Sequence, residues 1–128
     1  MSKTKLKWSN RGEGEDFEAA QKYLSLVASD AVAKRLVQDL RGSHVVEYAA
    51  KDLLRAAQLP LLARDDPHVD QDLKRIGKGK SLPPVLLVRG NIAEGLPLVV
   101  ADGYHRICAA IYCDESAPVA CRIVEIQR

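Results

Sequence analysis

The chain contains few aromatic residues: Phe17 and Trp8 are its only phenylalanine and tryptophan, and aromatics make up 5% of its 128 residues. A stacking surface for the bases of single-stranded nucleic acid is therefore not expected. No apolar run approaches the length of a membrane-spanning helix, and no signal-peptide core follows the basic N-terminus. We accordingly expect a cytoplasmic protein that does not act at a membrane.

Cysteine is also scarce, and the charge is nearly balanced. Cys108, Cys113 and Cys121 are odd in number and lack the Cys-x-x-Cys spacing of zinc sites, so we expect buried thiols rather than disulfides or a metal centre. With 19 basic and 17 acidic side chains, the net charge does not indicate a partner. Residues 3–11 and 74–80 are basic stretches without acids. Each is either a solvated segment or a contact to phosphates.

Hydrophobic spacing in the first third of the chain predicts helices. Residues 1–13 are polar and basic, which predicts a flexible basic arm. Residues 15–41 have helical spacing with a break at Ser29–Asp30, which predicts two helices within an N-terminal helical extension over residues 14–43. We expect this extension to pack on the rest of the domain or to join two copies in a homodimer.

Residues 44–128 alternate between short apolar runs and segments of helical spacing. Asp66 and Pro67 are a favourable N-cap and first residue for a helix. The spacing predicts strands and helices over the following ranges: strands at 44–48, 85–89, 98–101 and 118–126, and helices at 51–57, 67–76 and 104–113. The predicted fold class is therefore α+β, a small mixed β-sheet with flanking helices and the N-terminal helical extension.

The stretch Gly79-Lys80-Ser81 has the ending of a phosphate-binding loop, but the rest of that motif is missing. The motif needs a glycine where this chain has Lys74, and it needs a strand before it and a helix after it. Here a predicted helix precedes the stretch and a predicted strand follows it. We discard this interpretation.

The most informative stretch is LVVADGYHRICAAIYC, residues 98–113, in which a predicted strand turns through Asp102-Gly103 into a predicted helix. The start of a helix has unpaired N–H groups and a partial positive charge, both of which favour phosphate. Gly103 would let an anion approach the backbone, and His105 and Arg106 could donate hydrogen bonds to it. The alternative is purely structural: Asp102 caps the helix, His105 is half-buried and Arg106 pairs with an acid.

The run VVADGYHRICAA, together with the upstream LPLLARDDPHVDQDLKRIGKGKSLPPVLLV, resembles the ParB/sulfiredoxin superfamily over residues 44–126. In that superfamily nucleotide phosphates bind at the helix start through Gly-Cys-His-Arg in sulfiredoxin, Gly-Glu-Arg-Arg in ParB or Asp-Gly-His-His-Arg in the free-serine kinases. Residues 102–106, Asp-Gly-Tyr-His-Arg, are closest to the last of these. Tyr104 stands where sulfiredoxin has its catalytic cysteine, so peroxiredoxin repair is not expected. No helix-turn-helix segment is recognisable after the last predicted strand, so we do not expect a complete partition protein.

The resemblance implies a domain that binds a nucleotide or a phosphorylated small molecule. Its cofactors would be Mg²⁺ with ATP or CTP, and its reaction Mg-dependent NTP hydrolysis or phosphoryl transfer. The alternative function is a non-catalytic regulatory module or one that binds the DNA backbone. Whether the protein is an enzyme stays open at this point.

The implied site residues fall into two groups. Asp102 would hold the metal or orient a substrate hydroxyl, and Asp65 is the candidate for a second metal ligand or a base, its alternative being a solvated loop carboxylate. The residues that would contact the nucleotide or its phosphates are Gly103, Tyr104, His105, Arg106, Arg64 and Lys80.

Overall fold

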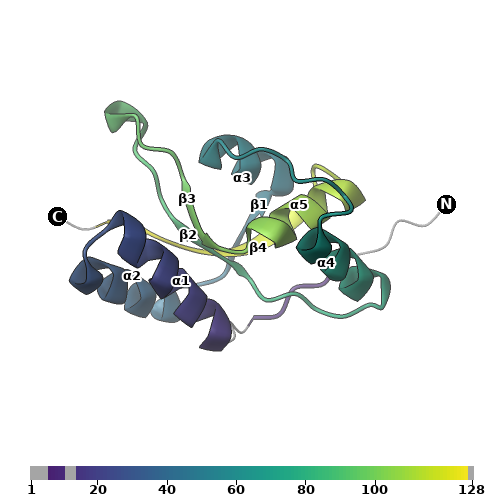
Figure 1. Cartoon of the computed structure of the whole chain (residues 1–128), viewed down its shortest axis with the longest axis horizontal. Coiled ribbons are helices and arrows are strands. Elements are labelled where there is room, and N and C mark those ends of the chain that lie inside the picture. The colour runs from purple at the N-terminus through teal and green to yellow at the C-terminus, as the bar shows by residue number, and fades with distance from the viewer. Residues whose placement is uncertain (1–5, 11–13, 127–128) are drawn as a thin grey trace.

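The computed structural model describes residues 6–10 and 14–126, which form five α-helices, one 3₁₀ turn and a four-stranded mixed β-sheet (Figure 1). This arrangement confirms the α+β class expected from the sequence. None of the helices in this described part of the chain is long and apolar enough to cross a membrane.

The sheet contains four strands, and its two central strands run parallel. In spatial order the strands are β1 (Val46–Ala49), β4 (Pro118–Val124), β2 (Val85–Val88) and β3 (Val99–Asp102). The β4–β2 pair is parallel, whereas β1–β4 and β2–β3 are antiparallel. Strands β2 and β3 form the predicted hairpin, which projects from the sheet and carries the 3₁₀ turn η1 (Ile92–Glu94) at its tip (Figure 1).

Strand β2 is apolar throughout because helices cover both of its faces. All four of its residues are buried, which is typical of a strand between two helical layers. Leu86 and Val88 join one hydrophobic cluster, and Val85 and Leu87 join the other. The alternation of side chains along this one strand therefore divides the core into two halves.

The first half of the core lies between the sheet and the two N-terminal helices. These are α1 (Gly14–Val27) and α2 (Asp30–Gly42), and the predicted break between them is confirmed by Ser29, whose side chain accepts a hydrogen bond from the Val32 amide at 3.2 Å. Their buried side chains pack against Leu86 in one cluster. Residues 14–42 thus form an integral layer of the domain rather than an addition to it.

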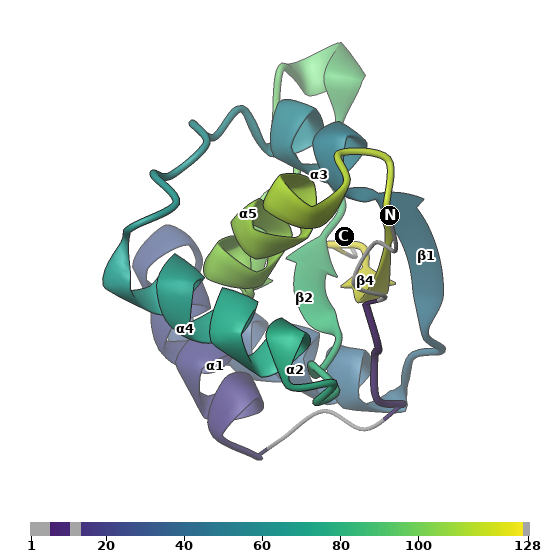
Figure 2. The same cartoon turned by 90° about the vertical axis from the view of Figure 1, so that its right-hand side faces the viewer.

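The second half of the core lies beneath helices α3 (Ala50–Ala57) and α5 (Tyr104–Cys113). Helix α4 (Pro67–Gly77) lies beside α5 (Figure 2), with Val69 and Ile76 in the same cluster as Cys108. The predicted start of α4 is confirmed, because the Asp66 side chain caps it and Pro67 is its first residue. All three cysteines are free thiols. Cys108 and Cys121 are buried, as expected, whereas Cys113, near the end of α5, is only partly buried.

Residues 6–10 belong to the segment for which the sequence predicts a flexible basic arm, and they instead pack on the domain. Trp8 forms a parallel bridge with Leu82, and its indole nitrogen donates to the Pro118 carbonyl at 3.1 Å. The apolar side chains of Leu6 and Trp8 contact both clusters on the α3–α5 face of the sheet. The partial burial of these two apolar side chains holds the segment on the domain despite its polar composition. The rest of the predicted arm lies outside the described residues.

Candidate functional site

The start of α5 is an uncapped helix N-terminus. It follows β3 through Gly103, whose φ of 110° is a conformation that side chains disfavour. A Cβ atom there would lie 3.0 Å from both γ-carbons of Val85. No side chain caps the helix, and the first described bond back into it runs from the Ile107 amide to the Gly103 carbonyl at 3.1 Å. The amides of residues 104–106 therefore have no intrahelical acceptor.

Arg106 points into the protein and is almost fully hydrogen-bonded there. It is 7% exposed, and its guanidinium donates to the carbonyls of Pro83 at 2.7 Å and Pro84 at 3.3 Å. It also pairs with Asp102 at 2.5 Å and with Asp16 of α1 at 3.4 Å. This guanidinium ties the entry to β2, the end of β3 and the first turn of α1 to one another. The pairing corresponds to the structural alternative that the sequence left open for Arg106.

Asp102 is a half-buried carboxyl that shares Arg106 with Asp16. Burial raises the pKa of Asp102 to about 6; the Arg106 guanidinium opposes this shift and the Asp16 carboxyl adds to it. The side chain of Asp102 does not cap α5. An acid with this pKa changes charge within the physiological range, and it borders the open helix terminus.

A small polar pocket of about 130 Å³ lies between the N-terminal halves of α4 and α5. It contains four of the residues that the sequence singles out, Asp102, Gly103, His105 and Arg106, and three that it does not. The additional residues are His68, Gln71 and Asp72, all from α4. Their spacing at i, i+3 and i+4 was a detectable signal, since it places all three on one face of a predicted helix.

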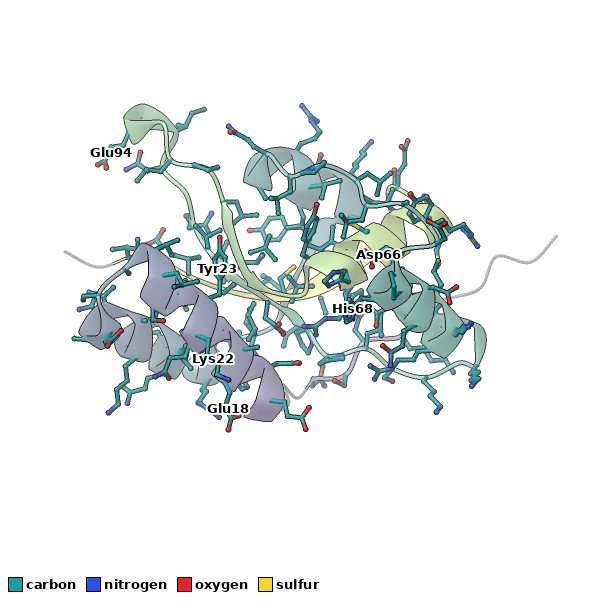
Figure 3. All side chains as sticks on the ribbon, in the orientation of Figure 1. Glu18, Lys22, Tyr23, Asp66, His68 and Glu94 are labelled. Carbon is teal, nitrogen blue, oxygen red and sulfur yellow. The ribbon has the colours of Figure 1, made fainter. Side chains whose placement is uncertain are left out.

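Two histidines meet at this pocket beside the cap of α4. The rings of His68 and His105 have centroids 4.7 Å apart, and His105 Nε2 lies 4.0 Å from an Asp66 carboxylate oxygen. The same oxygen accepts the amides of His68 at 2.9 Å and Val69 at 3.1 Å. These bonds, that of Val69 first, lower the pKa of Asp66. Figure 3 shows Asp66 and His68 together at the start of α4.

The pocket contains acids as well as histidines. Burial raises the pKa of Asp72, with Arg106 and Arg75 opposing the shift. Among the residues that the structure describes, no group of three or more His, Cys, Asp or Glu side chains could hold a metal ion. A Mg²⁺ ion at Asp102 would thus need oxygen ligands from a substrate and from water, which is how Mg²⁺ usually binds.

Four residues of the predicted site do not line this pocket: Arg64, Asp65, Lys80 and Tyr104. Arg64 lies with its guanidinium carbon 5.7 Å from the centre of the Tyr112 ring, and Asp65 is exposed in the same loop. Lys80 follows the C-terminal end of α4, a helix about 16 Å long. The pocket adjoins the N-terminal half of that helix. The position of this loop and of the far end of α4 relative to α5 depends on tertiary packing, which a short motif does not encode.

Tyr104 offers only its backbone to the site. Its hydroxyl donates to the Pro60 carbonyl at 2.5 Å, which directs the ring toward the loop before α4. The side chain therefore holds this loop against α5, and the Tyr104 amide remains one of the unpaired donors of the helix terminus.

A larger hollow of about 600 Å³ lies between α3 and the β2–β3 hairpin, with Leu53, Leu96 and Leu98 among its lining residues. It contains none of the residues that the sequence singles out, and no histidine. We place the candidate site at the smaller pocket, because hydrogen-bond donors, ionisable groups and a helix N-terminus meet there. Comparison with known proteins finds no match among family models, curated proteins or solved structures.

Proposed function

We propose that the protein binds the phosphate of a nucleotide, ATP or CTP, or of a phosphorylated small molecule at the N-terminus of α5. The observation that carries this proposal is an uncapped helix start that opens beside a polar pocket with two histidines. Unpaired amides and the helix dipole favour an anion there. The resemblance of residues 102–106 to a phosphate-binding run supports the same conclusion.

In this proposal the binding groups are the amides of Tyr104 and His105 together with the imidazoles of His68 and His105. Arg106 acts as a positioning residue, since its hydrogen bonds hold Asp102 and the start of α5 in place. Its positive charge still lies next to the pocket, although Asp16 and Asp102 offset it.

The acids of the pocket support binding in the presence of Mg²⁺. Asp72 and Asp102 would repel a bare polyphosphate, and a Mg²⁺ ion shared between Asp102 and phosphate oxygens would reduce this repulsion. When bound, Mg²⁺ would neutralise phosphate charge and so favour hydrolysis or phosphoryl transfer. The three free thiols and the use of a nucleotide are in keeping with a cytoplasmic location.

A regulatory module without turnover is the second candidate function. The observation that favours it is the direct bond between Asp102 and Arg106, because this bond occupies the carboxylate that catalysis would need. Asp65, the other catalytic candidate from the sequence, does not line the pocket. Release of phosphate or diphosphate during incubation with Mg-ATP or Mg-CTP would separate an enzyme from a module.

The binding test is a calorimetric titration of ATP, CTP, GTP and ADP, each with and without Mg²⁺, into the wild type and His105→Ala. Loss of a charge-assisted hydrogen bond is expected to weaken binding by roughly 10- to 100-fold. His44→Ala is the matched control, because His44 is exposed and lies outside the pocket. The proposal fails if no nucleotide binds, or if His105→Ala binds as tightly as His44→Ala.

A further inference from the structure

Lys7, from the first basic stretch of the sequence, lies on the same surface of the folded chain as the second basic stretch, residues 74–80. The Leu82 amide donates to the Lys7 carbonyl and the Ser9 amide donates to the Leu82 carbonyl, both at 2.9 Å. This pairing brings Lys7 beside the turn after α4, where a Cβ atom on Gly79 would lie 3.8 Å from the Lys7 ammonium. We call the resulting group the basic surface; its members are Lys7, Lys74, Arg75, Lys78 and Lys80.

Most of the cations of the basic surface have no ion-pair partner among the residues that the structure describes. Lys74 pairs with Asp70 at 3.0 Å, but Lys7, Lys78 and Lys80 form no ion pair with any described residue. Lysines at a helix C-terminus complement the helix dipole, and this accounts for Lys74 and Arg75. It does not account for Lys7, which comes from another segment. Because the net charge of the chain is only +2, the residues outside the basic surface together carry a net negative charge.

The turn that carries Lys78 and Lys80 is held in place by its own backbone. The Lys80 amide donates to the Arg75 carbonyl at 3.0 Å, and the Gly79 amide donates to the Ile76 carbonyl at 2.9 Å. Arg75 reaches the Ser81 carbonyl at 3.4 Å. The lysines therefore extend from a fixed base, which reduces the entropy lost when they bind an anion.

The surroundings of the basic surface favour a nucleic-acid duplex over other polyanions. Membrane-binding surfaces combine cations with exposed apolar side chains, but Ile76 and Leu82 are buried. Trp8, the only aromatic residue in this region of the described chain, is half-buried with its indole N–H bonded to Pro118, so it is not free to stack on an unpaired base. The C-terminal end of α4 repels anions at its backbone, so only long side chains can reach the phosphates.

We propose that the basic surface binds the phosphate backbone of duplex DNA without sequence preference. This function is separate from phosphate binding at α5, because the two surfaces lie at opposite ends of α4. Counterion release makes such binding fall steeply with salt. With Lys7, Lys78 and Lys80 as the contacting charges, a log–log plot of affinity against salt should have a slope of about −3.

The test measures fluorescence anisotropy of a labelled random-sequence duplex across a salt series, starting near 50 mM. The variant Lys78→Gln/Lys80→Gln should bind more weakly, with a slope near −1, since about one counterion is released per phosphate contact. Lys22→Gln/Lys34→Gln is the matched control: it removes the same charge from exposed lysines of α1 and α2, on the opposite face of the sheet. The control should keep the wild-type slope.

The proposal is overturned if the duplex does not bind at low salt, or if the control loses as much affinity as the basic-surface variant. Tighter binding to single-stranded DNA or to phosphatidylserine vesicles than to the duplex would also overturn it. The nucleotide titration described above should be the same in the wild type and in Lys78→Gln/Lys80→Gln. The two proposals can therefore fail independently of each other.

Discussion

Replacing Arg106 with methionine should destabilise the fold, and the size of the effect distinguishes a structural guanidinium from one that is free to bind phosphate. The side chain is 7% exposed and bonds to the carbonyls of Pro83 and Pro84 as well as to Asp102. Arg106→Met fills the volume but leaves two carbonyls and the carboxylates of Asp16 and Asp102 without their donor. Breaking a buried pair from one side costs about 3–5 kcal/mol.

The assay is urea unfolding of the wild type and Arg106→Met at about pH 5 and about pH 7.5. Without the guanidinium, the pKa of Asp102 should rise above its value of about 6, so at pH 5 this carboxyl is protonated and no longer a buried charge. The loss of stability should consequently be smaller at pH 5 than at pH 7.5.

Arg55→Met is the matched control for this substitution. The Arg55 side chain is 80% exposed, and its guanidinium lies 3.6 Å from an Asp52 carboxylate oxygen; surface pairs of this kind contribute about 0–1 kcal/mol. The reasoning is refuted if Arg106→Met costs no more than Arg55→Met. A small cost would mean that the guanidinium is available to a ligand.

Two further predictions concern the same junction. Gly103→Ala should lower the free energy of unfolding by about 1–3 kcal/mol through backbone strain, and the close contact of the new Cβ with Val85 should lower it further. The measurement is urea unfolding. The control is Gly42→Ala, which should cause little change because its Cβ would meet no atom within 4 Å. The contribution of Asp102 to wild-type stability should fall by about 1–2 kcal/mol as pH rises from the unfolded pKa of 3.8 through about 6, because its raised pKa means that the fold favours the protonated form. Asp102→Asn should flatten this pH dependence, and an equal slope in both proteins would contradict the assignment.

Local patterns were sufficient to predict most of the fold. The apolar run that forms β2, the Asp66–Pro67 start of α4 and the break at Ser29 each have a local physical cause, and each is observed. The packing of Trp8 on Leu82 joins residues 74 positions apart, and no periodicity encodes such a contact. For the same reason, helical spacing over residues 14–42 could not show that these helices complete the core above β2.

In the site, too, the features set by neighbouring residues were predictable and the contacts between distant residues were not. A strand, a glycine and a helix start were predictable at residues 102–104. That Arg106 pairs with an acid was one of the expected alternatives, but the acid was not named. It is Asp102, which lies at i, i+4 to Arg106 and which that alternative had assigned to the helix cap. The contacts of Arg106 with Asp16 and with the Pro83 carbonyl depend on tertiary packing. Because of these contacts, replacing Arg106 is expected to lower the stability of the fold.

The most direct test of phosphate binding at α5 follows backbone amide resonances by ¹H–¹⁵N NMR while Mg-ATP or Mg-CTP is added. The account predicts that the amides of Tyr104 and His105 shift most, because they are unpaired donors at the helix start. Inorganic phosphate should move the same two resonances in the same direction. Unchanged Tyr104 and His105 amides at saturating nucleotide, or shifts confined to the hollow beneath the β2–β3 hairpin, would contradict the account.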